Sequence, residues 1–180
     1  MQTPSNVQSR TPMTIIVRMP LLIVLLISLN ALAAGQQNVG LVDMAGRVTN
    51  IESHTGDDKW LVVMLWSITC GICAREVPVY SDFHDEHKGR DIKLLGVALD
   101  GYGKKKAIEG TMRRWGMRFP TLIADLGLFA INYKLQTGEQ LLGTPTFLIY
   151  TPKGKLVANN PGPMRTSALV DYIAKRRARE

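Results

Sequence analysis

The chain has 180 residues, enough for one domain with a hydrophobic core and a short leader. Its hydrophobic content of 46% and charged content of 21% are ordinary for a globular protein and exclude a chain that is disordered throughout. The net charge is +7, but the basic residues are scattered apart from residues 104–106 and 176–177. This pattern favours a solvated basic surface over a nucleic-acid-binding one.

An uncharged apolar segment, residues 19–34, follows two arginines near the N-terminus. It contains Ala31-Leu32-Ala33, which has the small-x-small pattern of a signal-peptidase site. We therefore expect residues 1–34 to be a signal peptide. An uncleaved membrane anchor is the alternative, because the segment nearly reaches the roughly 20 residues of a membrane span. In both cases the rest of the chain is exported, and we expect a periplasmic domain that is either soluble after cleavage or tethered to the inner membrane.

Residues 35–40 are expected to form a linker and residues 41–180 the domain. The expected elements, in chain order, are a hairpin at 41–51, a buried strand at 60–66, a helix at 74–88, a strand at 92–99, a helix at 104–117, an extended piece at 119–123, a helix at 126–135, strands at 146–150 and 156–158, and a helix at 166–179. Strands that alternate with helices and close with a hairpin and a helix predict a three-layer α/β domain with a mixed sheet.

The only two cysteines, Cys70 and Cys73, lie between the first buried strand and the helix that follows it. The positive end of a helix favours the thiolate of a cysteine placed there, which makes that sulfur a better attacking group. A second sulfur one turn further on can resolve the mixed disulfide. In an oxidising compartment the pair is expected to be disulfide-bonded unless something reduces it. The motif predicts a redox-active disulfide and no other cofactor.

Metal binding is the main alternative for a C-x-x-C motif. His84 and His87 give a spacing near that of a zinc finger, but fourteen residues of helix would put His84 about 20 Å from Cys70. Four ligands cannot then meet on one ion, so we expect solvent-facing histidines and no zinc site. A copper(I) site made by the two sulfurs stays open. An inert disulfide is disfavoured, because it closes too short a loop to restrain the unfolded chain.

Two further residues are candidates for the same chemistry. Glu76 shares a helix face with Cys73, and a desolvated carboxylate there could relay the proton of the resolving thiol. The alternative is an acid that only favours the helix dipole. Pro145 precedes the strand at 146–150, and we predict a cis Thr144–Pro145 bond close to the sulfurs, although a trans proline at a strand entry is also possible. The Thr144 backbone would then pair with an extended substrate segment.

These segments resemble the thioredoxin fold, and specifically the exported, membrane-linked reductases of the TlpA/ResA type. The resemblance covers about residues 41–179 and rests on the following motifs: Leu65-Trp66-Ser67-Ile68-Thr69-Cys70-Gly71-Ile72-Cys73, Glu76-Val77-Pro78, Phe119-Pro120-Thr121, Gly143-Thr144-Pro145-Thr146-Phe147-Leu148-Ile149 and Pro152-Lys153-Gly154-Lys155. It implies a thioredoxin-like three-layer sandwich with helices on both faces of a mixed sheet, an N-terminal hairpin, and a central insert between Asp100 and Thr144.

The resemblance also implies roles for residues of the site. Cys70 would attack, Cys73 would resolve, Glu76 would be the buried acid and Pro145 the cis proline that faces the sulfurs. The predicted substrate contacts are Trp66, Ile72 and Thr144. The sequence departs from the family at Thr69, where tryptophan is usual, at Ile72, where proline is usual, and at Met64, where thioredoxin itself buries an aspartate.

The expected function is therefore that of an exported thiol–disulfide oxidoreductase. The family implies that it reduces disulfides of periplasmic proteins and takes electrons from a membrane thiol donor. The scattered basic residues predict that it binds no nucleic acid. The alternative is a copper(I) chaperone, or a non-catalytic thioredoxin-fold binding protein, that uses the same two cysteines. A peroxidase of the peroxiredoxin type is a weaker alternative, because the Pro-x-x-x-Thr-x-x-Cys setting of its attacking cysteine is absent.

Overall fold

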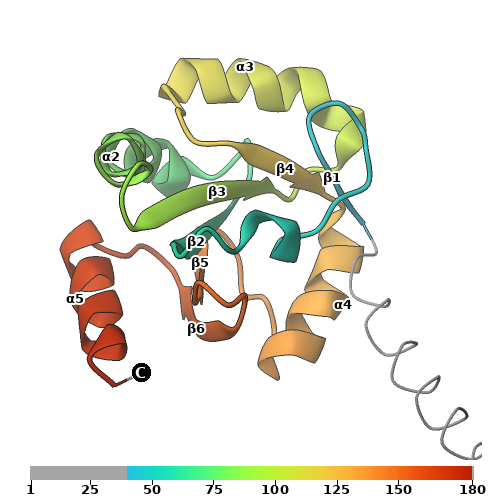
Figure 1. Ribbon diagram of the computed structural model, residues 1–180. Coiled ribbons are helices and arrows are strands. Elements are labelled where there is room, and N and C mark those ends of the chain that lie inside the picture. Colours follow the sequence, from blue (N-terminus) through green and yellow to red (C-terminus); the bar gives the residue numbers. More distant parts are fainter. Residues whose placement is uncertain (1–39, 180) are drawn as a thin grey trace, which may run out of the picture. The chain divides into compact units, whose positions relative to one another are not determined.

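A mixed sheet with helices on both faces forms the centre of the computed structural model, which describes residues 40–179 (Figure 1). The strands are β1 (Leu41–Val42), β2 (Trp60–Trp66), β3 (Ile92–Ala98), β4 (Thr121–Ala124), β5 (Thr146–Tyr150) and β6 (Leu156–Pro161). Their order is β1-β4-β3-β2-β5-β6. Strands β2, β3 and β4 are parallel, whereas β1, β5 and β6 run antiparallel to their neighbours. The predicted thioredoxin-like α/β sandwich is thereby confirmed.

Strand β2 lies at the centre of this sheet, and this position accounts for its apolar sequence. Every residue of Trp60–Trp66 is buried, and Val63 lies in register between Leu95 of β3 and Leu148 of β5. A strand covered on both faces has no solvent side, so it is a continuous apolar run instead of an alternating one. Its carboxyl end delivers the chain directly to Cys70.

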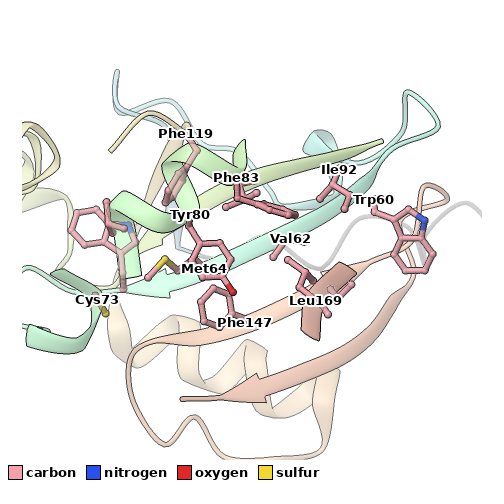
Figure 2. Packing of buried hydrophobic residues seen from close by; sticks show 14 of the residues in the cluster. Trp60, Val62, Met64, Cys73, Tyr80, Phe83, Ile92, Phe119, Phe147 and Leu169 are labelled. Atoms are coloured by element: carbon pink, nitrogen blue, oxygen red, sulfur yellow. The ribbon is translucent and has the colours of Figure 1, made fainter. Parts of the chain in front are cut away.

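Two apolar cores fill the space between the sheet and its helices. On one face Val62 and Met64 pack beneath α2 (Gly71–His87), α3 (Lys105–Trp115) and α5 (Thr166–Arg177). Figure 2 shows this cluster with Cys73 at one end, beside Met64, and Trp60 at the other. On the opposite face Val63 and the other odd-numbered residues of β2 pack beneath α4 (Leu126–Thr137). Successive side chains of β2 point to opposite faces of the sheet. The even-numbered residues therefore share a core with Cys73, and the odd-numbered residues share the other core with α4.

The N-terminal hairpin predicted at 41–51 is much reduced in the structure. Only Leu41 and Val42 form a strand, which pairs with β4, and a single antiparallel bridge joins Val42 to Val48. The intervening loop is held by the Asp43 carboxylate, which accepts the backbone N–H groups of Ala45 and Arg47. A short 3-10 helix, η1 (Glu52–His54), then leads toward β2.

The prediction that His84 and His87 face solvent is wrong, because both lie against the sheet side of α2 and are buried. The ring of His87 packs against Phe83 with 4.2 Å between centroids, and its Nδ1 lies 3.0 Å from Asp91 Oδ1. Burial lowers the pKa of His84, with Lys88 as the next contribution. The two imidazoles therefore belong to the core at the end of α2 that is remote from the cysteines.

Within residues 40–179, no helix combines the length and hydrophobicity needed to cross a membrane. The predicted signal peptide or anchor at residues 1–34 lies outside the described residues, as does nearly all of the linker at 35–40. The central insert is present between Asp100 and Thr144 and contains a 3-10 helix η2 (Tyr102–Lys104), then α3, β4 and α4.

Candidate active site

The two cysteines lie where β2 ends and α2 begins, and they form a disulfide with 5.2 Å between their Cα atoms. Their surroundings differ sharply. Cys70 is the N-cap residue of α2 and is partly exposed, whereas Cys73 lies in the first turn and is 0% exposed. Of the two sulfurs, therefore, only that of Cys70 is open to a partner molecule.

The start of α2 directs its backbone dipoles at Cys70. The Cys73 N–H donates to the Cys70 sulfur at 3.0 Å, and the first turn of the helix contains no acidic residue. The backbone N–H groups at the positive end of a 17-residue helix stabilise an anion, so the reduced Cys70 sulfur is placed to be a thiolate. This geometry agrees with the predicted attacking role of Cys70.

Asp100 holds the loop that leads from β2 into the cysteines. Its carboxylate accepts the Ser67 hydroxyl at 2.9 Å and the Ile68 N–H at 3.0 Å. The sequence analysis did not identify Asp100 as a site residue. A signal was available, since Asp100 lies two residues after β3, the strand beside β2, and the carboxyl ends of parallel strands meet at one edge of a sheet.

The loop before β5 approaches the disulfide from the other side. The Thr144–Pro145 bond is cis, which confirms that prediction. The Thr144 carbonyl oxygen lies 3.3 Å from the Cys70 sulfur, and Pro145 is buried. Among the described residues the Thr144 N–H has no hydrogen-bond partner. A donor beside the sulfurs is therefore free to pair with the backbone of a bound polypeptide.

Glu76 is partly buried on α2, one turn after Cys73. Burial raises the pKa of Tyr80, and the Glu76 charge adds to that effect. The Tyr80 hydroxyl donates to the Met164 carbonyl at 2.7 Å. Glu76 is thus close enough to affect a buried group on the same helix. The proton relay from Cys73 to Glu76 stays a prediction.

Of the three predicted substrate contacts, two are accessible. Ile72 lies between the two cysteines in the sequence and is exposed, and Thr144 is partly exposed. Trp66 is 0% exposed and packs against Trp115 with 5.6 Å between ring centroids. The prediction that Trp66 contacts the substrate does not fit this complete burial, because a residue of a strand covered on both faces has no surface to offer. Trp66 instead packs in the core at the end of β2 that precedes the cysteines.

A groove of about 510 Å³ opens next to the Thr144 loop. Its walls come from the ends of β3 and β4 and from the segment before Pro145. They combine apolar and charged side chains: Leu99, Leu126, Leu141, Leu142, Asp100, Lys104 and Asp125. Because Ser67 and Thr144 also line it, the groove leads to the cysteine loop and can receive an extended polypeptide segment. Among residues 40–179 no group of three or more histidines, cysteines or acids is placed to hold a metal ion.

Comparison with known proteins agrees with this geometry. The model of the AhpC/TSA family matches residues 36–159. A curated relative named thiol-disulfide oxidoreductase ResA, from Bacillus subtilis, is 24% identical over 178 residues, which cover 87% of this chain and 90% of the relative. The protein of the same name from Bacillus thuringiensis is 22% identical over 144 residues, covering 77% and 74% of the two chains.

Solved structures share the fold. StoA from Bacillus subtilis has a TM-score of 0.57 at 19% identity, covering 75% of this chain and 95% of StoA. A secreted disulfide oxidoreductase from Mycobacterium tuberculosis has a TM-score of 0.57 at 19% identity, covering 77% and 96%. At these identities the similarity establishes the thioredoxin-like fold and leaves function to the chemistry of the site.

Proposed function

The chain belongs to the AhpC/TSA family, and we propose that it is a thiol–disulfide oxidoreductase that acts on disulfides of proteins. The observation that carries the proposal is the asymmetry of the cysteine pair. One sulfur is accessible and caps the N-terminus of a helix, and the other is buried and disulfide-bonded to it. The names of the curated relatives support the same activity.

In the proposed reaction the reduced protein donates two electrons. The Cys70 thiolate attacks one sulfur of a substrate disulfide, forms a mixed disulfide and releases the first substrate thiolate. Cys73 loses its proton and attacks the Cys70 sulfur, which closes the Cys70–Cys73 disulfide and releases the second substrate thiolate. The substrate disulfide is reduced and the protein pair is oxidised, so a dithiol donor must then restore the pair.

Each neighbouring group has a part in these steps. The Cys73 N–H, 3.0 Å from the Cys70 sulfur, stabilises the attacking thiolate. We assign the proton of Cys73 to Glu76, the partly buried acid on its helix. The free Thr144 N–H aligns the substrate backbone, while Pro145 closes the site beside the sulfurs.

We further propose that the domain works outside the cytoplasm, with residues 1–34 as signal peptide or membrane anchor, and that a membrane thiol donor re-reduces it. The uncharged apolar segment at 19–34 supports export. A C-x-x-C pair in an oxidising compartment needs a dedicated donor if it is to act as a reductant. The direction of transfer depends on the reduction potential, which equilibration with glutathione would measure.

Reduction of insulin by the pre-reduced protein tests the activity. The wild type should cleave the insulin disulfides, and Cys70→Ser should be inactive. A wild type that binds copper(I) at one ion per protein and leaves insulin intact would overturn the proposal in favour of the copper chaperone. Rapid turnover of hydrogen peroxide with no insulin reduction would instead favour the peroxidase.

A further inference from the structure

Helix α4 differs from the other helices in what it exposes to solvent. Large exposed hydrophobic side chains are concentrated on it: of the ten in the described residues, four are Leu126, Leu128, Ile131 and Leu135. Three of these, Leu128, Ile131 and Leu135, follow the i, i+3, i+7 spacing of a single helix face. They are 43%, 61% and 78% exposed. We refer to these three residues as the α4 outer face.

The inner face of the same helix is already buried against the sheet. Phe129 and Tyr133 are buried in the core beneath the sheet, on the side of the helix opposite the outer face. The residues of the outer face are therefore not core residues that have been left uncovered. Lys134 is the single charged residue in α4, and no acid lies in the helix. A face of this composition suits an apolar surface with anionic groups at its edge.

The start of the described chain lies against this helix. A Cβ at Gly40 would be 3.1 Å from the Leu128 Cβ, so the backbone passes directly beside the first residue of the outer face. Only residues 35–39 separate the apolar, uncharged residues 19–34 from Gly40, and this stretch spans at most about 20 Å when fully extended. If residues 19–34 are in a bilayer, the α4 outer face is within reach of its surface.

We propose that the α4 outer face lies on the surface of the lipid bilayer that holds residues 19–34. This rests on the proposed function with residues 1–34 as an uncleaved anchor, and it goes beyond that anchor, because attachment alone leaves the domain free to face any direction. Leu128, Ile131 and Leu135 would enter the boundary between headgroups and acyl chains, and Lys134 would meet anionic headgroups. Because Leu126 of the same helix lines the groove beside the disulfide, the substrate entrance would open close to the membrane.

Site-specific photo-cross-linking of the full chain in vesicles tests the orientation. The chain is reconstituted in phosphatidylethanolamine and phosphatidylglycerol, with benzoylphenylalanine in place of Ile131 or of Leu135. The matched control replaces Val79 of α2, which is 52% exposed and lies on the other side of the sheet. We expect several-fold more label on lipid from positions 131 and 135 than from 79. In addition, Leu135→Asp should reduce lipid labelling from position 131, whereas Val79→Asp should not.

Three results would overturn the proposal. Equal lipid labelling from 131 and 79 would show that the domain has no preferred orientation. Cross-links from 131 to a second copy of the chain would assign the face to self-association. A chain that fails to float with the vesicles would remove the attachment and this proposal together. Insulin reduction in the same samples is a separate readout, so failure of the orientation is distinguishable from failure of the proposed activity.

Discussion

Helices α2 and α4 begin in the same way but are capped by different atoms. Each follows a parallel strand and starts at the same edge of the sheet (Figure 1). In α4 the Asp125 carboxylate accepts the N–H groups of Gly127 and Leu128 at 3.0 and 3.2 Å. In α2 the Cys70 sulfur accepts the Cys73 N–H at 3.0 Å. A carboxylate is a permanent anion and contributes stability. A sulfur becomes an anion only after reduction, so the same helix end contributes to reactivity.

The largest effect should come from removing the capping sulfur. Cys70→Ser should abolish reduction of insulin, because the accessible nucleophile is gone. Cys73→Ser should instead stop the reaction after the first step and accumulate a mixed disulfide through Cys70. Non-reducing electrophoresis and mass spectrometry of the adducts would distinguish the two. Mixed disulfides that accumulate in Cys70→Ser would reverse the assignment of roles.

The next effect concerns the loop in front of the sulfur cap. Asp100→Ala leaves the Ser67 hydroxyl and the Ile68 N–H without their acceptor, which should cost about 1–3 kcal/mol of unfolding free energy. The rate of insulin reduction should also fall, because the loop that carries Cys70 loses its support. Urea denaturation and insulin turbidity measure the two quantities. The conservative control is Asp100→Asn, which can still accept one of the two bonds and should lose less.

The carboxylate cap of α4 should behave as a purely structural feature. Asp125→Ala should lower the free energy of unfolding by about 1 kcal/mol, as for other helix N-caps. The loss should be the same in oxidised and reduced protein, because this cap does not change with redox state. Denaturation of both forms measures it. A loss confined to one redox state would contradict the contrast between the two helix starts.

The smallest effect is expected one turn after the sulfur cap. Glu76→Gln keeps the size of the side chain and removes the group that we assign to the proton of Cys73. The fold should be retained and the pH dependence of thiol exchange should change, measured as the insulin reduction rate between pH 6 and 9. A pH profile that matches the wild type would show that Glu76 has no part in proton transfer and is only an acid near the start of a helix.

Sequence predicted best those parts of the fold that are buried on both sides. Strands β2 and β5 match the predicted residues, because a central strand is a long apolar run with polar turns at both ends. Helix α2 begins at Gly71, three residues before the prediction, since apolar periodicity does not reveal a cap made by a sulfur. The burial of the α2 histidines depends on which elements cover them, and that is set by packing between distant segments. The burial of Trp66 follows from the predicted buried strand at 60–66, so the substrate contact predicted for Trp66 conflicts with that strand.

The sequence likewise predicted some features of the site and missed others. The Cys70–Cys73 motif and the cis bond at Pro145 carry local signals, and both were predicted. Asp100 is distant from Cys70 in sequence and becomes a site residue only through the pairing of β2 with β3. The groove likewise depends on the assembled layers and could not be inferred from spacing along the chain. The spacing of the α4 outer face is visible in the sequence, but its exposure is set by the assembled layers.

The central claim is that α2 activates Cys70 and not Cys73. It is tested most directly by the rates at which the two sulfurs of the reduced protein react with iodoacetamide as pH is varied, resolved by mass spectrometry. We expect Cys70 to be alkylated first and to titrate below the value of about 8.5 for a free cysteine. Cys73 should remain protected at the same pH because it is buried. Earlier labelling of Cys73, or a Cys70 that titrates at or above the free value, would contradict it.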